Sequence, residues 1–293
     1  MHSAFGLVFT VLCVFIVVKM RSDSAILGGG PTTLLTSLFK TNDISPEVQK
    51  HLARVFFLVA CGVGIASLGC YLGILSGISN GASLVLGAFG AIALLMCALT
   101  TDRSLASRPR RTALFAAFAA AEGLALSPIA RALSIRSPYL LFEVLFLSGA
   151  VFAAFACAAL VSRRRAYVAF YGTLGSVASM LLMISLINVF FVRSTSVQNI
   201  ELGLGLLLAV AFTAVHTQII VERASVGGME PDALADAAQL FLDLVQIFIR
   251  IAIIMLRKGE RGEGGGGGGG GGSVESFVSN TVGKVGGSSR DDL

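Results

Sequence analysis

The sequence predicts an all-α membrane protein in which six apolar helices surround a central C-terminal helix. Its composition is 55% hydrophobic and only 13% charged, against roughly 25% charged residues in an average soluble domain. A chain with so little charge cannot cover a water-soluble surface of its length, so we assign it to the lipid bilayer. The other two observations are six long apolar runs and, after them, one amphipathic stretch at residues 236–250.

The C-terminal stretch carries a single polar stripe. Asp236, Gln239, Asp243, Gln246 and Arg250 are spaced three or four residues apart, so they share one face of a helix. The residues around them are almost all apolar. Polar groups in hydrocarbon are costly unless they face protein or trapped water. The pattern therefore predicts a helix enclosed by other helices, with its stripe facing an internal cavity.

The six apolar runs are predicted to be membrane spans joined by short connections, so sequential helices are expected to be antiparallel neighbours. Their approximate bounds are 55–76, 82–100, 112–133, 139–161, 166–191 and 201–221. Small residues four apart allow helix backbones to touch in lipid. Three such pairs predict close contacts, although ordinary glycine content also explains them: Gly69 with Gly73, Gly87 with Ala91, and Gly172 with Ser176.

Loop charge predicts the orientation of the spans. Four arginines lie in the loop 101–111 and three at 163–165, whereas the loops 77–81, 134–138 and 192–200 carry one arginine at most. Positively charged loops stay in the cytosol, so the first of the six spans begins there. The last helix leaves two alternatives. A full crossing places Arg257 and Lys258 on the far side, against the charge rule, and a re-entrant helix keeps them cytosolic.

The chain divides into three regions. Residues 1–34 form an N-terminal apolar segment and connector, 35–258 the transmembrane domain, and 259–293 a glycine-rich tail. Nine consecutive glycines at 264–272 predict a flexible linker before a disordered end. The apolar run 4–18 is short for a span, which needs about 20 residues. An extra N-terminal anchor helix, a cleaved segment and an extension of the gene model all remain open for it.

The sequence gives no sign of an enzyme or of a nucleic-acid-binding protein. The formal charge of +5 is small and sits in loops, which is a topology signal rather than a nucleic-acid patch. Metalloprotease, serine-hydrolase and phosphate-loop motifs are absent. We therefore expect no catalytic residues and no cofactor.

Several segments resemble the Bax inhibitor-1 family. Residues 44–56 (ISPEVQKHLARVF) are similar to the segment that opens that family's first span. Residues 162–167 (SRRRAY), followed by 186–191 (LINVFF), are similar to its fifth-helix region. Residues 216–224 (HTQIIVERA), followed by 240–244 (LFLDL), are similar to its C-terminal signature. The resemblance covers about residues 35–256.

This resemblance implies a seven-helix Bax inhibitor-1-like fold and a multi-pass protein of the endoplasmic reticulum membrane. It implies suppression of programmed cell death through a pH-sensitive Ca²⁺ leak or Ca²⁺/H⁺ exchange, with Ca²⁺ as the transported ion. The expected partners are the lipid bilayer, Ca²⁺, H⁺ and cell-death regulators of the Bcl-2 type. The alternative is a membrane scaffold that binds such regulators and conducts nothing.

The resemblance also implies a gate made of two membrane-embedded aspartates. Asp243 matches the second, but His216 stands at the position of the first, and Gln239 replaces a further family acid. We expect Asp243 to be the gate and a tentative Ca²⁺ ligand, and His216 to be its titrating partner. Alternatively, His216 packs against a backbone carbonyl and Asp243 makes a structural hydrogen bond.

Other polar residues are candidates for a cation pathway. Arg250 is a candidate ion partner for Asp243, two turns away. Glu122 precedes Ser127-Pro128, where a proline kink can open backbone carbonyls to a cavity. The candidate set, whose acids can equally be packing residues, is Glu122, Glu143, Gln239, Gln246 and Arg250.

Overall fold

The computed structural model describes residues 46–101, 107–161, 166–192, 194–225 and 232–263. Residues up to Leu256 form one compact unit and those from Arg257 a second, and the account below concerns the first. The apolar run 4–18, the connector, the arginines at 163–165, the glycine run and the tail lie outside the described residues.

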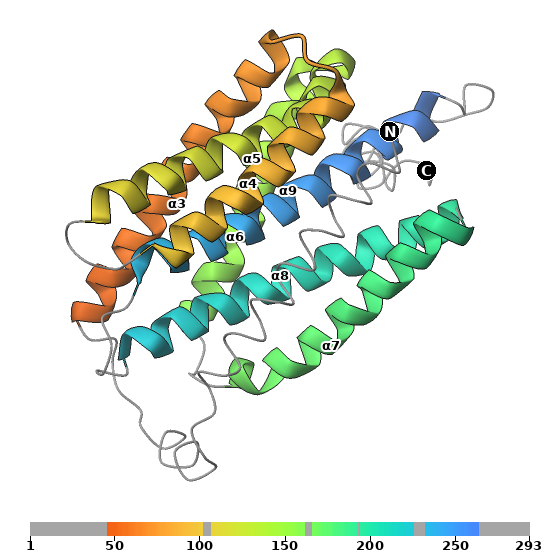
Figure 1. Cartoon of the computed structure of the whole chain (residues 1–293). Coiled ribbons are helices and arrows are strands. Elements are labelled where there is room, and N and C mark those ends of the chain that lie inside the picture. Colours follow the sequence, from red (N-terminus) through yellow and green to blue (C-terminus); the bar gives the residue numbers. More distant parts are fainter. Residues whose placement is uncertain (1–45, 102–106, 162–165, 193, 226–231, 264–293) are drawn as a thin grey trace, which may run out of the picture. The chain divides into compact units, whose positions relative to one another are not determined.

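Within the described ranges the chain forms seven α-helices, which confirms the predicted fold class (Figure 1). Six of them are long and apolar enough to cross a membrane. In α7 the described apolar part, Gly172–Ile187, falls short of that length, and the run predicted at 166–191 ends in a π-helical turn. The helices are α3 (Pro46–Leu75), α4 (Asn80–Thr100), α5 (Arg108–Arg136), α6 (Pro138–Val161), α7 (Ala166–Ile187), the turn η2 (Asn188–Val192), α8 (Thr195–Ser225) and α9 (Ala233–Glu263).

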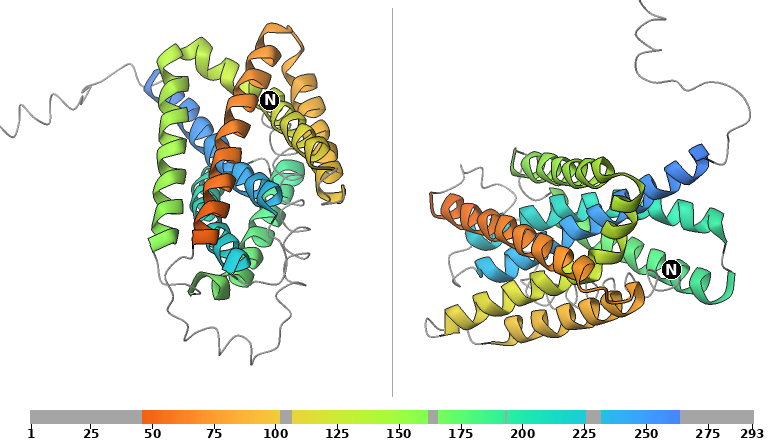
Figure 2. Two further views of the ribbon diagram at one scale, coloured as in Figure 1. Left: turned by 90° about the vertical axis from the view of Figure 1, so that its left-hand side faces the viewer. Right: turned by 90° about the horizontal axis from the view of Figure 1, so that it is seen from above.

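Helix α9 is the central element, as the polar stripe predicts. It runs between the group formed by α3, α4 and α5 and the pair α7 and α8 (Figures 1 and 2). Its apolar side chains are buried in a core shared with α3, α4, α5, α6 and α8. Phe241 packs edge-on against Phe118 of α5, with ring centroids 5.6 Å apart. The apolar flanks of α9 thus pack against protein, and the stripe between them is buried as well.

Glycines bring α3 and α4 into backbone contact with α5. A Cβ added to Gly69 of α3 would collide with the Ala120 backbone, and one added to Gly87 of α4 would collide with the Ala125 backbone. These contacts confirm the predicted role of the first two small-residue pairs. The third prediction is wrong, because Gly172 is exposed and a Cβ there would meet nothing within 4 Å.

Helix α5 continues through Pro128 without opening a carbonyl to a cavity. Proline has no N–H to bond the carbonyl four residues earlier, which here is that of Leu124. The Ser127 hydroxyl donates to that Leu124 oxygen at 2.7 Å instead. The expectation of a proline-opened carbonyl is therefore wrong, since the freed oxygen is satisfied within the helix.

Helix α9 runs beside α5 from start to end. Arg111, in the first turn of α5, pairs with Asp232 directly before α9, with 2.6 Å between Nη2 and Oδ2. Arg136, at the end of α5, donates from Nη1 to the Leu256 carbonyl at 2.8 Å. Because α9 is unbroken between these contacts, it crosses the bundle as α5 does. Helix α9 is thus long and apolar enough to cross a membrane, and we predict a full crossing over the re-entrant alternative.

Candidate functional site

The polar stripe of α9 divides into two separate clusters. Asp236, near the start of the helix, contacts His51 of α3 and Arg223 of α8. Asp243, Gln246 and Arg250 line a cavity further along. The prediction that the whole stripe faces one cavity is therefore correct only for its second half.

The structure brings His216 of α8 and Asp243 of α9 together. His216 Nδ1 lies 2.7 Å from Asp243 Oδ2, and the two side chains are only 4% and 5% exposed. When Asp243 is ionised its carboxylate can only accept, so Nδ1 then carries the proton. The imidazole also stacks on Phe212, with ring centroids 5.3 Å apart. The pair is thus held by one hydrogen bond and by a ring that fixes the orientation of the imidazole.

The cavity lies between α7, α8 and α9. Its volume is about 30 Å³, enough for on the order of two water molecules. Most of its lining is apolar, and the polar groups gather where α8 faces α9. The lining residues are Ala178, Leu181, Glu201, Gly205, Leu208, Ala209, Phe212, Asp243, Gln246 and Arg250.

Arg250 fits into this cavity because α8 has a glycine opposite it. A Cβ added to Gly205 would lie 2.6 Å from Arg250 Nε. The buried guanidinium donates from Nη1 to the Gln246 carbonyl oxygen at 3.1 Å and also to the Gln246 side-chain oxygen. These bonds hold the Arg250 guanidinium against Gln246, which lies one helical turn earlier in α9. The predicted pairing of Arg250 with Asp243 remains a prediction.

The other predicted pathway residues do not line the cavity. Glu122 is buried on α5, Glu143 is exposed on α6, and Gln239 is buried on α9. Glu201, which the sequence does not single out, also lines the cavity. Its signal is its spacing, because it precedes Gly205 by four residues on the same helix face. That signal is weak because Glu201 stands at the first residue of the predicted span 201–221.

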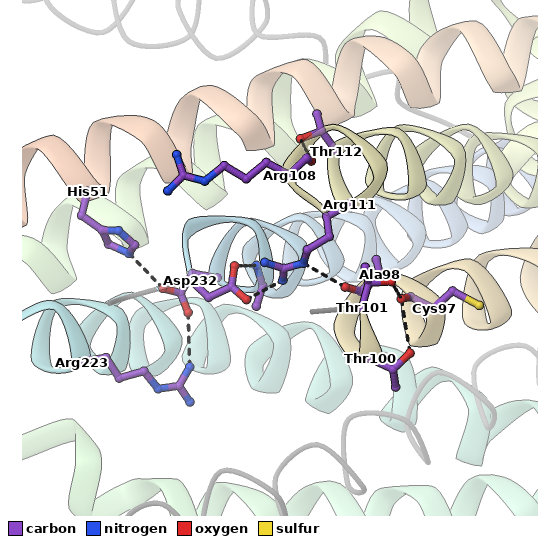
Figure 3. A network of polar contacts seen from close by, with 12 residues as sticks. His51, Cys97, Ala98, Thr100, Thr101, Arg108, Arg111, Thr112, Arg223 and Asp232 are labelled. Atoms are coloured by element: carbon purple, nitrogen blue, oxygen red, sulfur yellow. Dashed lines mark hydrogen bonds and ion pairs between the residues drawn. The ribbon is translucent and has the colours of Figure 1, made fainter. Parts of the chain in front are cut away.

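A second polar cluster connects several helices near the start of α9 (Figure 3). Asp236 accepts from His51 of α3 at 3.0 Å and from Arg223 of α8 at 3.3 Å. Next to it, Arg111 bonds both Asp232 and, through Nε, the Ala98 carbonyl of α4 at 3.2 Å. Buried charges of this kind are stable only when they are paired. The cluster therefore fixes the ends of α3, α4, α5, α8 and α9 to one another.

Comparison with known proteins agrees with this architecture. The family model described as inhibitor of apoptosis-promoting Bax1 matches residues 48–260. The chain is 33% identical to Bax inhibitor 1 of Arabidopsis thaliana over 221 residues, which cover 75% of this chain and 86% of that protein. It is 31% identical to Bax inhibitor 1 of Rattus norvegicus and 30% identical to that of Homo sapiens, each over 75% of this chain and 90% of the relative. The chain is thus a multi-pass membrane protein that belongs to the Bax inhibitor family of inhibitors of apoptosis.

Proposed function

We propose that this protein suppresses programmed cell death from the endoplasmic reticulum membrane by letting Ca²⁺ leave the store, as a pH-sensitive leak channel or Ca²⁺/H⁺ exchanger. Family membership supports the part in cell death. The observation that carries the transport proposal is the buried His216–Asp243 pair at the cavity between α7, α8 and α9.

An acid at this depth has a high energetic cost. A charged side chain in a membrane span costs roughly 3 kcal/mol or more, so intramembrane acids are functional by default. A hydrophobic residue in place of Asp243 would avoid that cost. The acid instead lines a cavity able to hold water, which favours an ion pathway over a purely packed interior.

The pair links cation binding to protonation. Ca²⁺ binds carboxylate and carbonyl oxygens, so Asp243 is the residue that contacts the ion. Its Oδ2 is occupied by His216 at 2.7 Å. Imidazole changes its charge near physiological pH, and a positive ring attracts the carboxylate more strongly than a neutral one. A proton on His216 therefore competes with Ca²⁺ for Asp243, which makes the flux sensitive to pH.

Ca²⁺ flux from liposomes containing the full chain tests the proposal. In Asp243→Asn we expect flux to fall at least several-fold and its pH dependence to flatten, because the amide keeps the shape but loses the charge. Glu143→Gln is the matched control, since Glu143 is exposed on α6 and does not line the cavity. The control should keep both the flux and the pH response.

Unchanged flux in Asp243→Asn would contradict the transport proposal. Correctly folded native protein that passes no Ca²⁺ at any pH would favour the non-conducting scaffold instead. Microscopy of the tagged full chain beside a reticulum marker tests the location.

A further inference from the structure

We propose that the cavity between α7, α8 and α9 is an internal water site, in which Gln246 holds a water molecule against Asp243 and so supplies the proton exchange of the His216–Asp243 pair. The inference rests on the proposed proton-coupled function and deepens it by naming a positioning residue and a route for the proton. Gln246 and Asp243 both line the cavity and are three residues apart on α9. Residues at that spacing are neighbours on one helix face.

The amide of Gln246 indicates what kind of molecule the cavity takes. The side chain is 3% exposed, and its oxygen accepts from Arg250. Its Nε2 has no hydrogen-bond partner in the part of the chain that the structure describes. A buried N–H left unbonded lowers stability, so most such groups in proteins bond to the protein or to ordered water. The donor therefore requires a small hydrogen-bond acceptor within the cavity.

Water is the acceptor that fits both the volume and the charges. The cavity of about 30 Å³ has room for about two water molecules. The lining offers donors at Arg250 and Gln246, and it offers carboxylate acceptors at Asp243 and Glu201. The carboxylates repel an anion, and the guanidinium repels a metal cation. A neutral water accepts from Nε2 through its oxygen and donates to a carboxylate through its hydrogens.

The Asp243 carboxylate can bind this water and keep His216. An ionised carboxylate offers about four acceptor positions, and the bond from His216 Nδ1 at 2.7 Å uses one of them. A buried water makes about three hydrogen bonds. Gln246 Nε2 and Asp243 supply two of these, and the second water in the cavity supplies the third. The inner water is therefore held in a fixed orientation against Asp243.

The charged and titratable groups around these waters lie on two helices. Within the described residues, α7 contributes only apolar residues to the lining and α3 to α6 contribute none. The groups are His216 and Glu201 on α8, and Asp243 and Arg250 on α9. Glu201 is partly exposed, so a proton enters the cavity on its side.

The two waters give Asp243 a route for protons. An incoming proton binds the outer water, which passes one of its hydrogens to the inner water. The inner water passes a hydrogen to the Asp243 carboxylate, and both waters end neutral. Each O–H bond that breaks is replaced by one that forms. No metal ion has to move past the Arg250 guanidinium.

Infrared difference spectra of the full chain in nanodiscs, recorded between two pH values in H₂¹⁶O and in H₂¹⁸O, test the water site without measuring transport. An internal water whose bonds change on protonation gives an O–H stretching band that shifts in the heavier water. The native chain should show this band. In Gln246→Met the band should weaken several-fold, because methionine has a similar length but no N–H.

Gln239→Met is the matched control. Gln239 is also a buried glutamine of α9, but it does not line the cavity. The control should keep the infrared band. In liposomes, the Ca²⁺ flux of Gln246→Met should respond to a sudden change of pH several-fold more slowly than that of the native chain, whereas Gln239→Met should respond as quickly.

An undiminished band in Gln246→Met would overturn the water site and leave transport through Asp243 standing. An equally fast response to the pH change would overturn the proton route. A band that depends on Gln246 in a chain without Ca²⁺ flux would support the water site and reject the transport proposal. If Gln246→Met does not fold, Ala178→Val decides the matter. Its added methyl groups fill the cavity from α7, so the band should disappear, and a full band would count against the site.

Discussion

At the scale of single residues, the proposed gate depends on which side chain stands at position 216. His216 faces Asp243 at 2.7 Å. Two carboxylates at such a distance repel when both are ionised and share one proton when they are not. Protonation of a histidine–aspartate pair instead converts a hydrogen bond from a neutral imidazole to a carboxylate into an ion pair. Both the pair of carboxylates and the histidine–aspartate pair are held more tightly at low pH. Only the pair of carboxylates also gains charge repulsion when the pH rises.

His216→Asp should therefore make Ca²⁺ flux more dependent on pH than in the native chain. On raising the pH, the second carboxylate of the variant ionises, pushes the helices apart and attracts the cation, so flux should rise more steeply. The measurement is flux from liposomes across pH 5–8, with His216→Asn as the control that removes titration at this position. If the flux of the native chain and of His216→Asp depends on pH in the same way, this prediction is contradicted.

At the scale of helices, small residues decide how closely α3, α4 and α5 approach. Gly123 of α5 faces the Ala66 backbone of α3, and Gly69 of α3 faces the Ala120 backbone of α5. Lipid tails are as apolar as leucine, so association in the bilayer relies on such close backbone contact instead of hydrophobic burial. The three helices thus form a rigid wall against which α9 packs.

Gly123→Ala should destabilise the protein by about 1–3 kcal/mol, because the added methyl group collides with the Ala66 carbonyl on a backbone that cannot yield. Gly172→Ala is the matched control on α7, where the methyl group meets nothing within 4 Å. It should be neutral or slightly stabilising, since alanine is the better helix former by about 1 kcal/mol. The measurement is thermal unfolding of both variants in detergent. An equal loss of stability in the two variants would contradict the proposed backbone contact at Gly123.

At the scale of the whole bundle, α9 is the element that the others enclose. Arg111 and Arg136, at opposite ends of α5, contact Asp232 directly before α9 and Leu256 in its last part. The bundle therefore presents the charged cluster around Asp236 at one end and the Arg136–Leu256 contact at the other. The cavity with Asp243 lies between these ends, within the membrane-spanning part of α9.

Cysteine labelling tests the full crossing of α9. In a background without the native cysteines, Arg110→Cys at the start of α5 and Lys258→Cys after Leu256 are both exposed positions. A membrane-impermeant maleimide applied to sealed vesicles should reach only one of the two, and the other only after permeabilisation. Labelling of both from the same side would restore the re-entrant arrangement.

The sequence by itself determined the all-α membrane class, five of the six predicted spans and the enclosed last helix, and the family resemblance predicted that His216 is the partner of Asp243. Each follows from a local signal, because hydrocarbon demands about 20 apolar residues per helix and a period of 3.6 shows which face is polar. Only the tertiary structure decided that α9 runs unbroken beside α5, that Asp236 belongs to a separate cluster and that Glu201 lines the cavity. Periodicity identifies a polar face but not what lies opposite it. That depends on contacts such as Arg136 with Leu256, between residues far apart in the chain.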